Sequence, residues 1–293
     1  MSEYINDNFP YLLDKDIDGQ RQPIKKVQDI IFSIVLEIDR ICRKHNIPYA
    51  LAFGSALGLY NYQGFIPWDD DADIAIDYAD LSRLIAALKE DLSSDFEFTC
   101  YEVDERCNIL IPAIKVRKKV GYMRDKNYRR LKDRTQSYEG FFVDIVPFMG
   151  VPSASKHRSL IFKSQVRMIF YFISDFIFNH DPLKMKKKIK KEEALAAERY
   201  KEAPYVCQTP FIPFQTPGVN LYPRDVIYPF KEYEFNGVKL YSFNNVKEFC
   251  RIRYLAKNLK KLVNEEYIDP WPKNKRKTAH IKAYSLTKYP KKS

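Results

Sequence analysis

Four aspartates fall within five consecutive positions, in residues 68–74, which read Trp-Asp-Asp-Asp-Ala-Asp-Ile. Carboxylates at this spacing repel one another strongly unless cations share them. If a strand begins at Asp71, Asp71 and Asp73 project from one face and the apolar residues that alternate with them fill the other. Mg²⁺ in proteins is commonly bound by one or two carboxylates together with substrate phosphates. The segment therefore predicts a site for one or two hard divalent ions and a phosphate-bearing ligand. A solvated acidic turn is the alternative.

A glycine and a serine, Gly54 and Ser55, follow an expected strand over residues 49–53. Glycine lets backbone amides approach a phosphate closely, and the serine hydroxyl is a further donor. The pair therefore predicts a phosphate contact near the acidic segment. A glycine bend without a ligand is the alternative.

A third carboxylate, Asp144, interrupts an otherwise apolar run at residues 140–148, which read Gly-Phe-Phe-Val-Asp-Ile-Val-Pro-Phe. Aromatic and β-branched residues in such a run indicate a buried strand. An acid inside it must be paired, protonated or metal-bound, because burying a lone carboxylate costs several kcal/mol. Alternatively, Asp144 caps a turn before Pro147.

These motifs together resemble the LicD and fukutin-like phosphotransferases, which have a nucleotidyltransferase-type fold. The resemblance rests on residues 54–58, 64–74 and 142–147. It continues more weakly through residues 222–230, 235–238 and 267–270 to His280, and so covers roughly residues 25 to 285. The chain departs from the usual family residues at Asn61, Ala72, Met149 and Ile268, which leaves the donor and acceptor open.

Members of that family transfer a phosphorylated alcohol, such as phosphocholine or ribitol phosphate, from a CDP-linked donor to a hydroxyl on a glycan, using divalent metal. The resemblance implies that Asp71 and Asp73 bind metal. It also implies that Gly54 and Ser55 contact the donor phosphate, and that Asp144 is catalytic.

Five further residues are candidates for substrate binding. Trp68 offers a face for choline or a cytosine ring, with packing of a turn as the alternative. Asp70 lies within the acidic segment, and His280 matches a family position, although a surface or core histidine fits it equally. Lys115 and Arg117 share one face of an expected strand and could point at donor phosphates. Solvated lysines on an edge strand are the alternative.

The expected mechanism follows from these assignments. Asp71 and Asp73 would hold Mg²⁺ or Mn²⁺ on the donor diphosphate and neutralise charge on the departing nucleotide. Asp144 would either complete the metal site or take the proton of the acceptor hydroxyl. Two other functions are open: a nucleotidyltransferase that moves the nucleotide itself, and a non-catalytic basic protein that binds anionic glycan or nucleic acid.

The elements that must position these residues form an α+β fold. Apolar residues at helical spacing predict a helix over residues 24–44. A helix over residues 80–90 follows, with Asp80 as a possible N-cap. With strands near residues 96–102 and 109–116, residues 24–150 form a nucleotidyltransferase-like mixed sheet flanked by helices. Residues 151–285, helical over 156–200 and rich in proline and aromatics over 203–245, form an acceptor-side lobe packed on this core. Residues 286–293 are a basic tail.

The net charge of +11 and the pI near 9.2 call for an anionic partner. With the motifs above, we expect a CDP-linked alcohol and a glycan or lipid-linked glycan rather than nucleic acid. Four scattered histidines make a zinc site improbable. Five cysteines without a CxxC pair, and an N-terminus without a basic and apolar leader, favour the cytoplasm.

Residues 159–178 are the most apolar segment of the chain. Lys163, Arg167 and Asp175 would be costly in hydrocarbon, so we reject a transmembrane helix. Two interpretations remain: a helix buried in the core, or a helix that docks on the inner face of a membrane. In the second, the lysines of residues 184–191 would meet anionic lipid. A solvated helix face is the alternative for those lysines.

Overall fold

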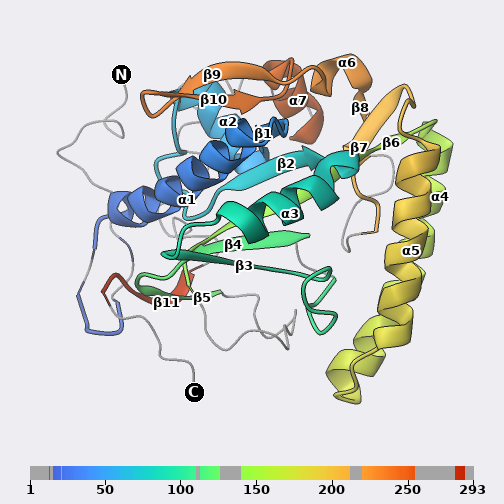
Figure 1. The fold of residues 1–293 in the computed structure, drawn as a ribbon, viewed down its shortest axis with the longest axis horizontal. Helices are drawn as coiled ribbons and strands as arrows, with labels where there is room; N and C mark the ends of the chain where they lie inside the picture. The colour runs from blue at the N-terminus through green and yellow to red at the C-terminus, as the bar shows by residue number, and fades with distance from the viewer. Residues whose placement is uncertain are drawn as a thin grey trace.

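The computed structural model describes residues 13, 16–20, 22–109, 113–125, 140–211, 220–254 and 281–287. They form a mixed α+β fold around a central sheet flanked by helices, as predicted (Figure 1). The helices are α1 (Ile24–Lys44), α2 (Phe53–Tyr62), α3 (Leu81–Asp91), α4 (Ala154–Phe172), α5 (Leu183–Arg199), α6 (Arg224–Ile227) and α7 (Val246–Arg253). A 3₁₀ turn, η1 (Tyr78–Asp80), precedes α3, and a π-helical turn, η2 (Ile173–Ile177), follows α4.

The strands are β1 (Tyr49–Ala52), β2 (Asp73–Asp77), β3 (Phe96–Cys100), β4 (Ile114–Lys118), β5 (Tyr122–Asp125), β6 (Phe142–Val151), β7 (Tyr205–Gln208), β8 (Tyr222–Pro223), β9 (Lys231–Phe235), β10 (Val238–Ser242) and β11 (Ile281–Ser285). The main sheet runs in the order β3-β4-β6-β2-β1-β10-β9, and β7 joins it by pairing with β6 and with β8. The β2–β6 and β1–β10 pairs are parallel, and the other pairs of this sheet are antiparallel. The main sheet therefore contains strands from both predicted parts of the chain, residues 24–150 and residues 151–285.

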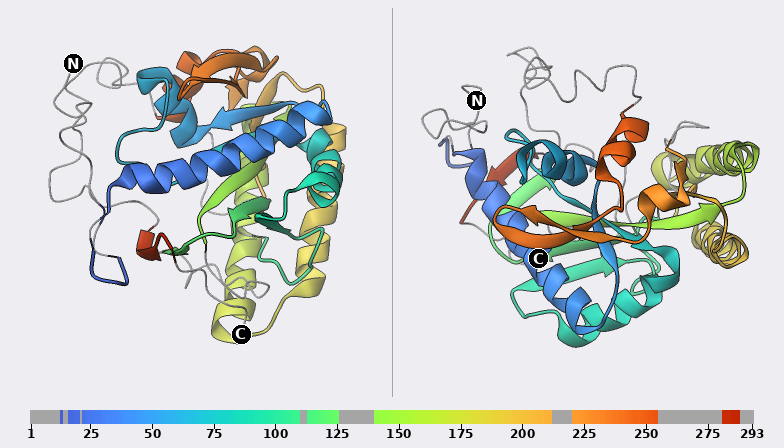
Figure 2. Two further views of the ribbon diagram at one scale, coloured as in Figure 1. Left: turned by 60° about the vertical axis from the view of Figure 1, so that its left-hand side comes forward. Right: turned by 90° about the horizontal axis from the view of Figure 1, so that it is seen from above.

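Helix α1 confirms the prediction from its apolar spacing. Its apolar stripe, including Val27, Ile34 and Ile38, is fully buried. The helix packs on β4, β6 and α3. On the other face of the sheet, α2 packs against α7 and against β1 and β2 (Figure 2, right). The sheet is thus covered on both faces, and every residue of its long central strand β6 is buried.

Several local predictions need correction. Strand β2 begins at Asp73 and not at Asp71, because three aspartates in a row disfavour a paired strand. Its residues Ile74, Ala75 and Ile76 are all buried, since both faces of the sheet are covered. Asp80 stands at the N-cap position of α3 as predicted, but it has helical dihedrals and its side chain makes no capping bond. Asp77 instead caps η1, accepting from the backbone amide of Ala79.

The predicted helical region at residues 156–200 is a hairpin of α4 and α5 that lies at one end of the sheet (Figures 1 and 2). The core-helix interpretation holds for only one side of α4. Ile161, Met168 and Tyr171 are buried, whereas Phe162 and Phe170 are exposed. Among the described residues, no helix combines the length and apolarity needed to cross a bilayer.

Candidate active site

The parallel pairing of β2 with β6 brings Asp73 and Asp144 directly opposite each other. Residues paired in this way project from the same face of a sheet. On the other side of β6, β4 places Lys115 opposite Asp144, and Lys115 Nζ lies 2.8 Å from Asp144 Oδ1. Both side chains are nearly buried. The interpretation of Asp144 as a turn cap is therefore wrong, because β6 continues through Pro147 to Val151.

The three aspartates that precede β2 gather next to this pair. Asp69, Asp70 and Asp71 each place one carboxylate oxygen within 4.8 Å of the others. Such a set of hard oxygen donors fits Mg²⁺ or Mn²⁺. Asp69 was missed as a site residue in the sequence, although it stands in the same acidic run. The structure thus adds Asp69 to the candidate metal ligands Asp71, Asp73 and Asp144.

The electrostatics of the acidic loop show mutual repulsion between its carboxylates. Burial raises the pKa of Asp69 well above its usual range, and the charges of Asp71 and Asp70 raise it further. A hydrogen bond with Asp71 acts in the same direction. A divalent cation among these oxygens would reverse these effects, because an opposite charge favours the ionised form. The donor set therefore fits a metal ion.

Polar contacts from distant parts of the chain hold the acidic loop in place. Gln28 Nε2 on α1 donates to the carbonyl oxygens of Ile66 (3.1 Å) and Asp69 (3.0 Å). The backbone amide of Ile281 on β11 donates to Asp70 Oδ2 over 2.8 Å. Asp70 is buried, with only 1% of its surface exposed. This burial favours a role for Asp70 in positioning the loop over the predicted contact with substrate.

Helix α2 begins directly at the acidic loop. Phe53, Gly54 and Ser55 form its first turn, so the pair predicted to contact a phosphate lies at a helix N-terminus. The first backbone N–H groups of a helix have no partner within it, and this end carries partial positive charge. A Cβ on Gly54 would lie 2.8 Å from Asp69 Oδ2, so a side chain at this position would displace the Asp69 carboxylate. The start of α2 is therefore suited to an anion next to the carboxylates.

Ser55 has a structural contact within the site. Its side chain is buried, and its hydroxyl oxygen accepts a hydrogen bond from the backbone amide of Asp73 over 3.0 Å. This bond ties the first turn of α2 to the first residue of β2. Ser55 thereby fixes the distance between the helix start and Asp73.

Comparisons with known proteins agree with this arrangement. Residues 46–189 match the family model described as LicD/FKTN/FKRP, nucleotidyltransferase domain. This match, which covers just under half of the chain, supports a LicD-family domain over these residues. A stretch of 62 residues is 29% identical to the lipopolysaccharide cholinephosphotransferase LicD of Haemophilus influenzae. That stretch is 21% of this chain and spans only 23% of the relative.

The matched LicD domain contains α2, the acidic loop, β2 and Asp144, whereas α7 lies beyond it. The Arg253 guanidinium at the end of α7 stands 4.8 Å from the centre of the Phe53 ring, at the start of α2. Its Nε is buried without a hydrogen-bond partner, and no carboxylate of the described residues pairs with it. Arg253 is therefore a cation placed near the N-terminal end of α2.

Tyr254, the residue after α7, also lies near the LicD-domain acids. Burial raises the pKa of its hydroxyl, and the charges of Asp69 and Asp73 contribute to the rise. Neither Arg253 nor Tyr254 carries a sequence signal, because each reaches the site only through the packing of α7 on α2.

The other predicted residues of the LicD domain have mixed outcomes. Trp68 is half-buried in the acidic loop. Lys115 and Arg117 are buried, and Arg117 Nη1 donates to Thr99 Oγ1 over 3.0 Å. The edge-strand alternative for these two residues is wrong, since β4 lies between β3 and β6. His280 and residues 267–270 lie outside the described residues.

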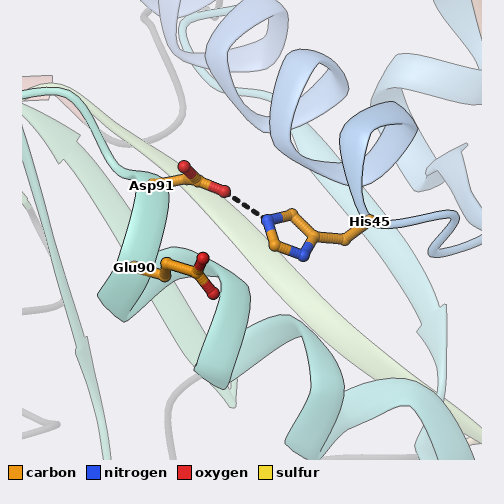
Figure 3. A group of neighbouring side chains, drawn as sticks. All are labelled: His45, Glu90 and Asp91. Atoms are coloured by element: carbon orange, nitrogen blue, oxygen red, sulfur yellow. Dashed lines mark hydrogen bonds and ion pairs between the residues drawn. The ribbon is translucent and has the colours of Figure 1, made fainter.

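A second group of possible ligands, His45, Glu90 and Asp91, lies where the C-terminal ends of α1 and α3 meet (Figure 3). Asp91 Oδ2 bonds to His45 Nε2, and Asp91 Oδ1 accepts from Lys44 Nζ over 2.6 Å. These hydrogen bonds, with Lys44 as the larger contributor, lower the pKa of Asp91. The group is explained as an ion-pair cluster that joins two helices, and we assign no metal to it.

Proposed function

We propose that this protein transfers a phospho-alcohol, phosphocholine-like or a polyol phosphate, from a CDP-linked donor to a hydroxyl of a cell-surface glycan or its lipid-linked precursor. The match to the LicD family supports a phosphotransferase acting on cell-surface glycans. The name of the Haemophilus influenzae relative supports phosphocholine as one candidate. The observation that carries the proposal is the meeting of Asp73, Asp144 and the acidic loop at the start of α2.

In this proposal, Asp71, Asp73 and Asp69 hold Mg²⁺ or Mn²⁺. The ion, when bound, neutralises charge on the donor diphosphate. The backbone N–H groups of the first turn of α2 donate to a donor phosphate oxygen. Arg253, whose charge has no carboxylate partner among the described residues, binds the same diphosphate from the side of α7.

Asp144 has one of two roles toward the acceptor. It either completes the metal site beside Asp73 or accepts the proton of the attacking hydroxyl. The ammonium of Lys115, 2.8 Å away, fixes the position of its carboxylate. Lys115 is therefore proposed to position Asp144. This role replaces the contact with donor phosphates that was expected from the sequence.

The description of the matching family as a nucleotidyltransferase domain favours a second candidate. In that reaction the nucleotide itself is transferred and pyrophosphate is released. Phospho-alcohol transfer from a CDP-linked donor releases CMP instead. The identity of the released product therefore separates the two reactions.

We also propose the cytoplasm as the place of the reaction. All five cysteines are buried thiols, and none forms a disulfide. Thiols persist in reducing compartments, which supports this assignment.

The proposal is tested by thermal stabilisation, which needs no acceptor. CDP-choline, CDP-ribitol, CDP-glycerol, UDP-sugars and ATP are each added with and without Mg²⁺ or Mn²⁺. The proteins are the wild type, Asp71→Asn, and the control Asp91→Asn, which removes an acid from the His45 cluster. We expect one CDP-alcohol to stabilise the wild type and Asp91→Asn only with metal, and to have no effect on Asp71→Asn. Stabilisation by ATP or a UDP-sugar instead would favour the nucleotidyltransferase, and no response to any nucleotide would contradict both candidates.

A further inference from the structure

The outer side of α4 and the tip of its hairpin with α5 carry a continuous exposed apolar stripe. Five of its members are between 59% and 71% exposed: Phe162, Ile169, Phe170, Ile177 and Phe178. Val166 and Ile173 lie between them and are also exposed. The spacing of four, three, one, three and four residues keeps the six members from 162 to 177 on one helix face, and Phe178 follows directly after η2. Scattered exposed apolar residues are ordinary, but a contiguous set of this size marks a contact surface.

The opposite side of α4 attaches the helix to the rest of the protein. Ile161, Met168 and Tyr171 are buried there, and Tyr171 donates to Asn108 Oδ1 over 3.2 Å. Arg167 pairs with Glu192 across the two helices of the hairpin. The hairpin is thus anchored by the inner side of α4, and the exposed residues of the apolar stripe lie on its other side. Figure 2 (right) shows the two helices side by side at the end of the sheet.

Basic residues adjoin the stripe. Four exposed lysines form no ion pair within the described part of the chain: Lys163 on α4, and Lys184, Lys188 and Lys191 on α5. The α5 lysines share the helix face opposite the buried residues Lys186 and Glu193. Of the two acids at the tip, Asp175 is buried and Asp181 pairs with Lys186 over 2.8 Å. The hairpin therefore carries exposed aliphatic and aromatic side chains on α4 and η2, and exposed lysines without ion pairs among the described residues on α4 and α5.

We propose that this surface, the stripe of α4 and η2 together with the outer lysines of α5, docks on an anionic lipid bilayer. A bilayer interface offers acyl chains to the apolar residues and negative headgroups to the lysines beside them. A second copy of the chain fits less well, because a two-fold contact would bring the two lysine clusters together. A docked hairpin would hold the catalytic domain at a surface that carries lipid-linked acceptors, but the docking itself does not depend on the proposed reaction.

Co-sedimentation of the full chain with vesicles tests the proposal without donor or acceptor. One set of vesicles is phosphatidylcholine alone, and the other contains phosphatidylglycerol as well. The apolar variant is Ile177→Ser/Phe178→Ser, and its control is Ile17→Ser/Val238→Ser, two exposed residues away from the hairpin. The charge variant is K184E/K188E/K191E, and its control is K89E/K231E/K247E, exposed lysines elsewhere with the same change in net charge.

We expect the wild type to prefer the anionic vesicles, and each hairpin variant to lose about tenfold or more of its partition coefficient. Both controls should retain most of the binding. Failure of the wild type to bind anionic vesicles would overturn the proposal, as would an equal loss in the controls. A dimer in light scattering that the apolar variant converts to a monomer would assign the stripe to contact between copies and also overturn it.

A second readout does not depend on the variants that lose binding. In Phe178→Trp, the new indole should shift its emission to the blue on adding anionic vesicles, and brominated lipid should quench it. The same measurement on Val238→Trp is the control, because that residue lies on β10, away from the hairpin. Quenching equal in both proteins, or absent from both, would contradict insertion of the hairpin tip.

Discussion

Two acidic regions of this molecule contrast in how their carboxylates are neutralised. On α1, the Glu37 carboxylate receives two hydrogen bonds from Arg40, of 2.8 and 2.9 Å, and two more from Ser93. The bonds from Arg40 are the main cause that lowers the pKa of Glu37 to about 2. In the loop before β2, burial and the neighbouring carboxylates raise the pKa of Asp69 instead.

The difference agrees with a structural role for the acids of α1 and with the proposed metal-binding role of the acidic loop. Along α1, Glu37 and Asp39 are each matched with an arginine, as Asp39 is with Arg43 over 2.7 Å. In the acidic loop, carboxylates face one another at the cost of repulsion in the absence of cations. Strain of this kind is typical of functional sites, where the compensating group is a ligand.

The largest expected effect comes from neutralising the acidic loop. Asp71→Asn or Asp73→Asn should lower the rate of donor turnover by more than about a hundredfold, because loss of even the outer partners of a metal costs 10–100-fold. The melting temperature without metal should stay the same or rise, since repulsion is relieved. Asp91→Asn should do the reverse, lowering the melting temperature and sparing turnover. If Asp71→Asn lowered the melting temperature in the absence of metal, the contrast between the acidic loop and the paired acids would be contradicted.

Arg253 offers the next largest effect, because its charge is unmatched within the described structure, unlike that of Arg40. Arg253→Leu should raise the KM for the donor by about tenfold or more, because this factor corresponds to the free energy of a charge-assisted hydrogen bond. Arg253→Lys should recover part of the loss, as it keeps the charge and loses the planar fork. Steady-state kinetics measure both constants. A KM that is unchanged in Arg253→Leu would remove Arg253 from the site.

Two glycines of α2 separate function from folding. Gly54→Ala places a Cβ 2.8 Å from Asp69 Oδ2, a side-chain atom that can move, so activity should fall about tenfold with little loss of stability. Gly58→Ala places its Cβ 2.4 Å from the carbonyl oxygen of Gly64 and 2.9 Å from the amide of Ile66. Because backbone atoms cannot move aside easily, this variant should lose about 1–3 kcal/mol or more of its free energy of unfolding. Urea unfolding and turnover assays check both, and equal destabilisation would refute the distinction.

The smallest effect concerns the paired acids. Because the pKa of Glu37 in the folded state, about 2, lies below its ordinary value of 4.5, its pairing stabilises the fold fully above pH 4.5. This contribution is lost as the pH falls from about 4.5 to about 2. Glu37→Gln should therefore be less stable than the wild type at neutral pH, and the difference should shrink over that interval. Denaturant unfolding at several pH values measures it, and a constant difference would contradict the assigned pairing.

The sequence allowed prediction where the signal is local. Helical spacing identified α1, and the apolar run around Asp144 identified the buried strand β6. The start of β2 was misplaced because alternation alone cannot distinguish a strand from the loop that leads into it. The alternative of a glycine bend at Gly54 and Ser55 is wrong, because these residues lie in the first turn of a helix.

Contacts between distant segments were beyond local signals. Gln28, Arg253 and Ile281 reach the acidic loop or the start of α2 only because α1, α7 and β11 pack around them. No spacing rule relates these positions to the aspartates. The exposed side of α4 was also ambiguous, since an apolar helix segment has the same composition whether its outer face is buried or not.

Direct titration with Mn²⁺ tests the central claim, that the aspartates around β2 form a divalent-metal site. Calorimetry or electron paramagnetic resonance would be applied to the wild type, Asp71→Asn/Asp73→Asn, and Asp91→Asn. The account predicts saturable binding to the wild type and to Asp91→Asn, and an affinity at least about tenfold lower in the double variant. Absence of saturable binding to the wild type, or equal affinity in all three proteins, would contradict it.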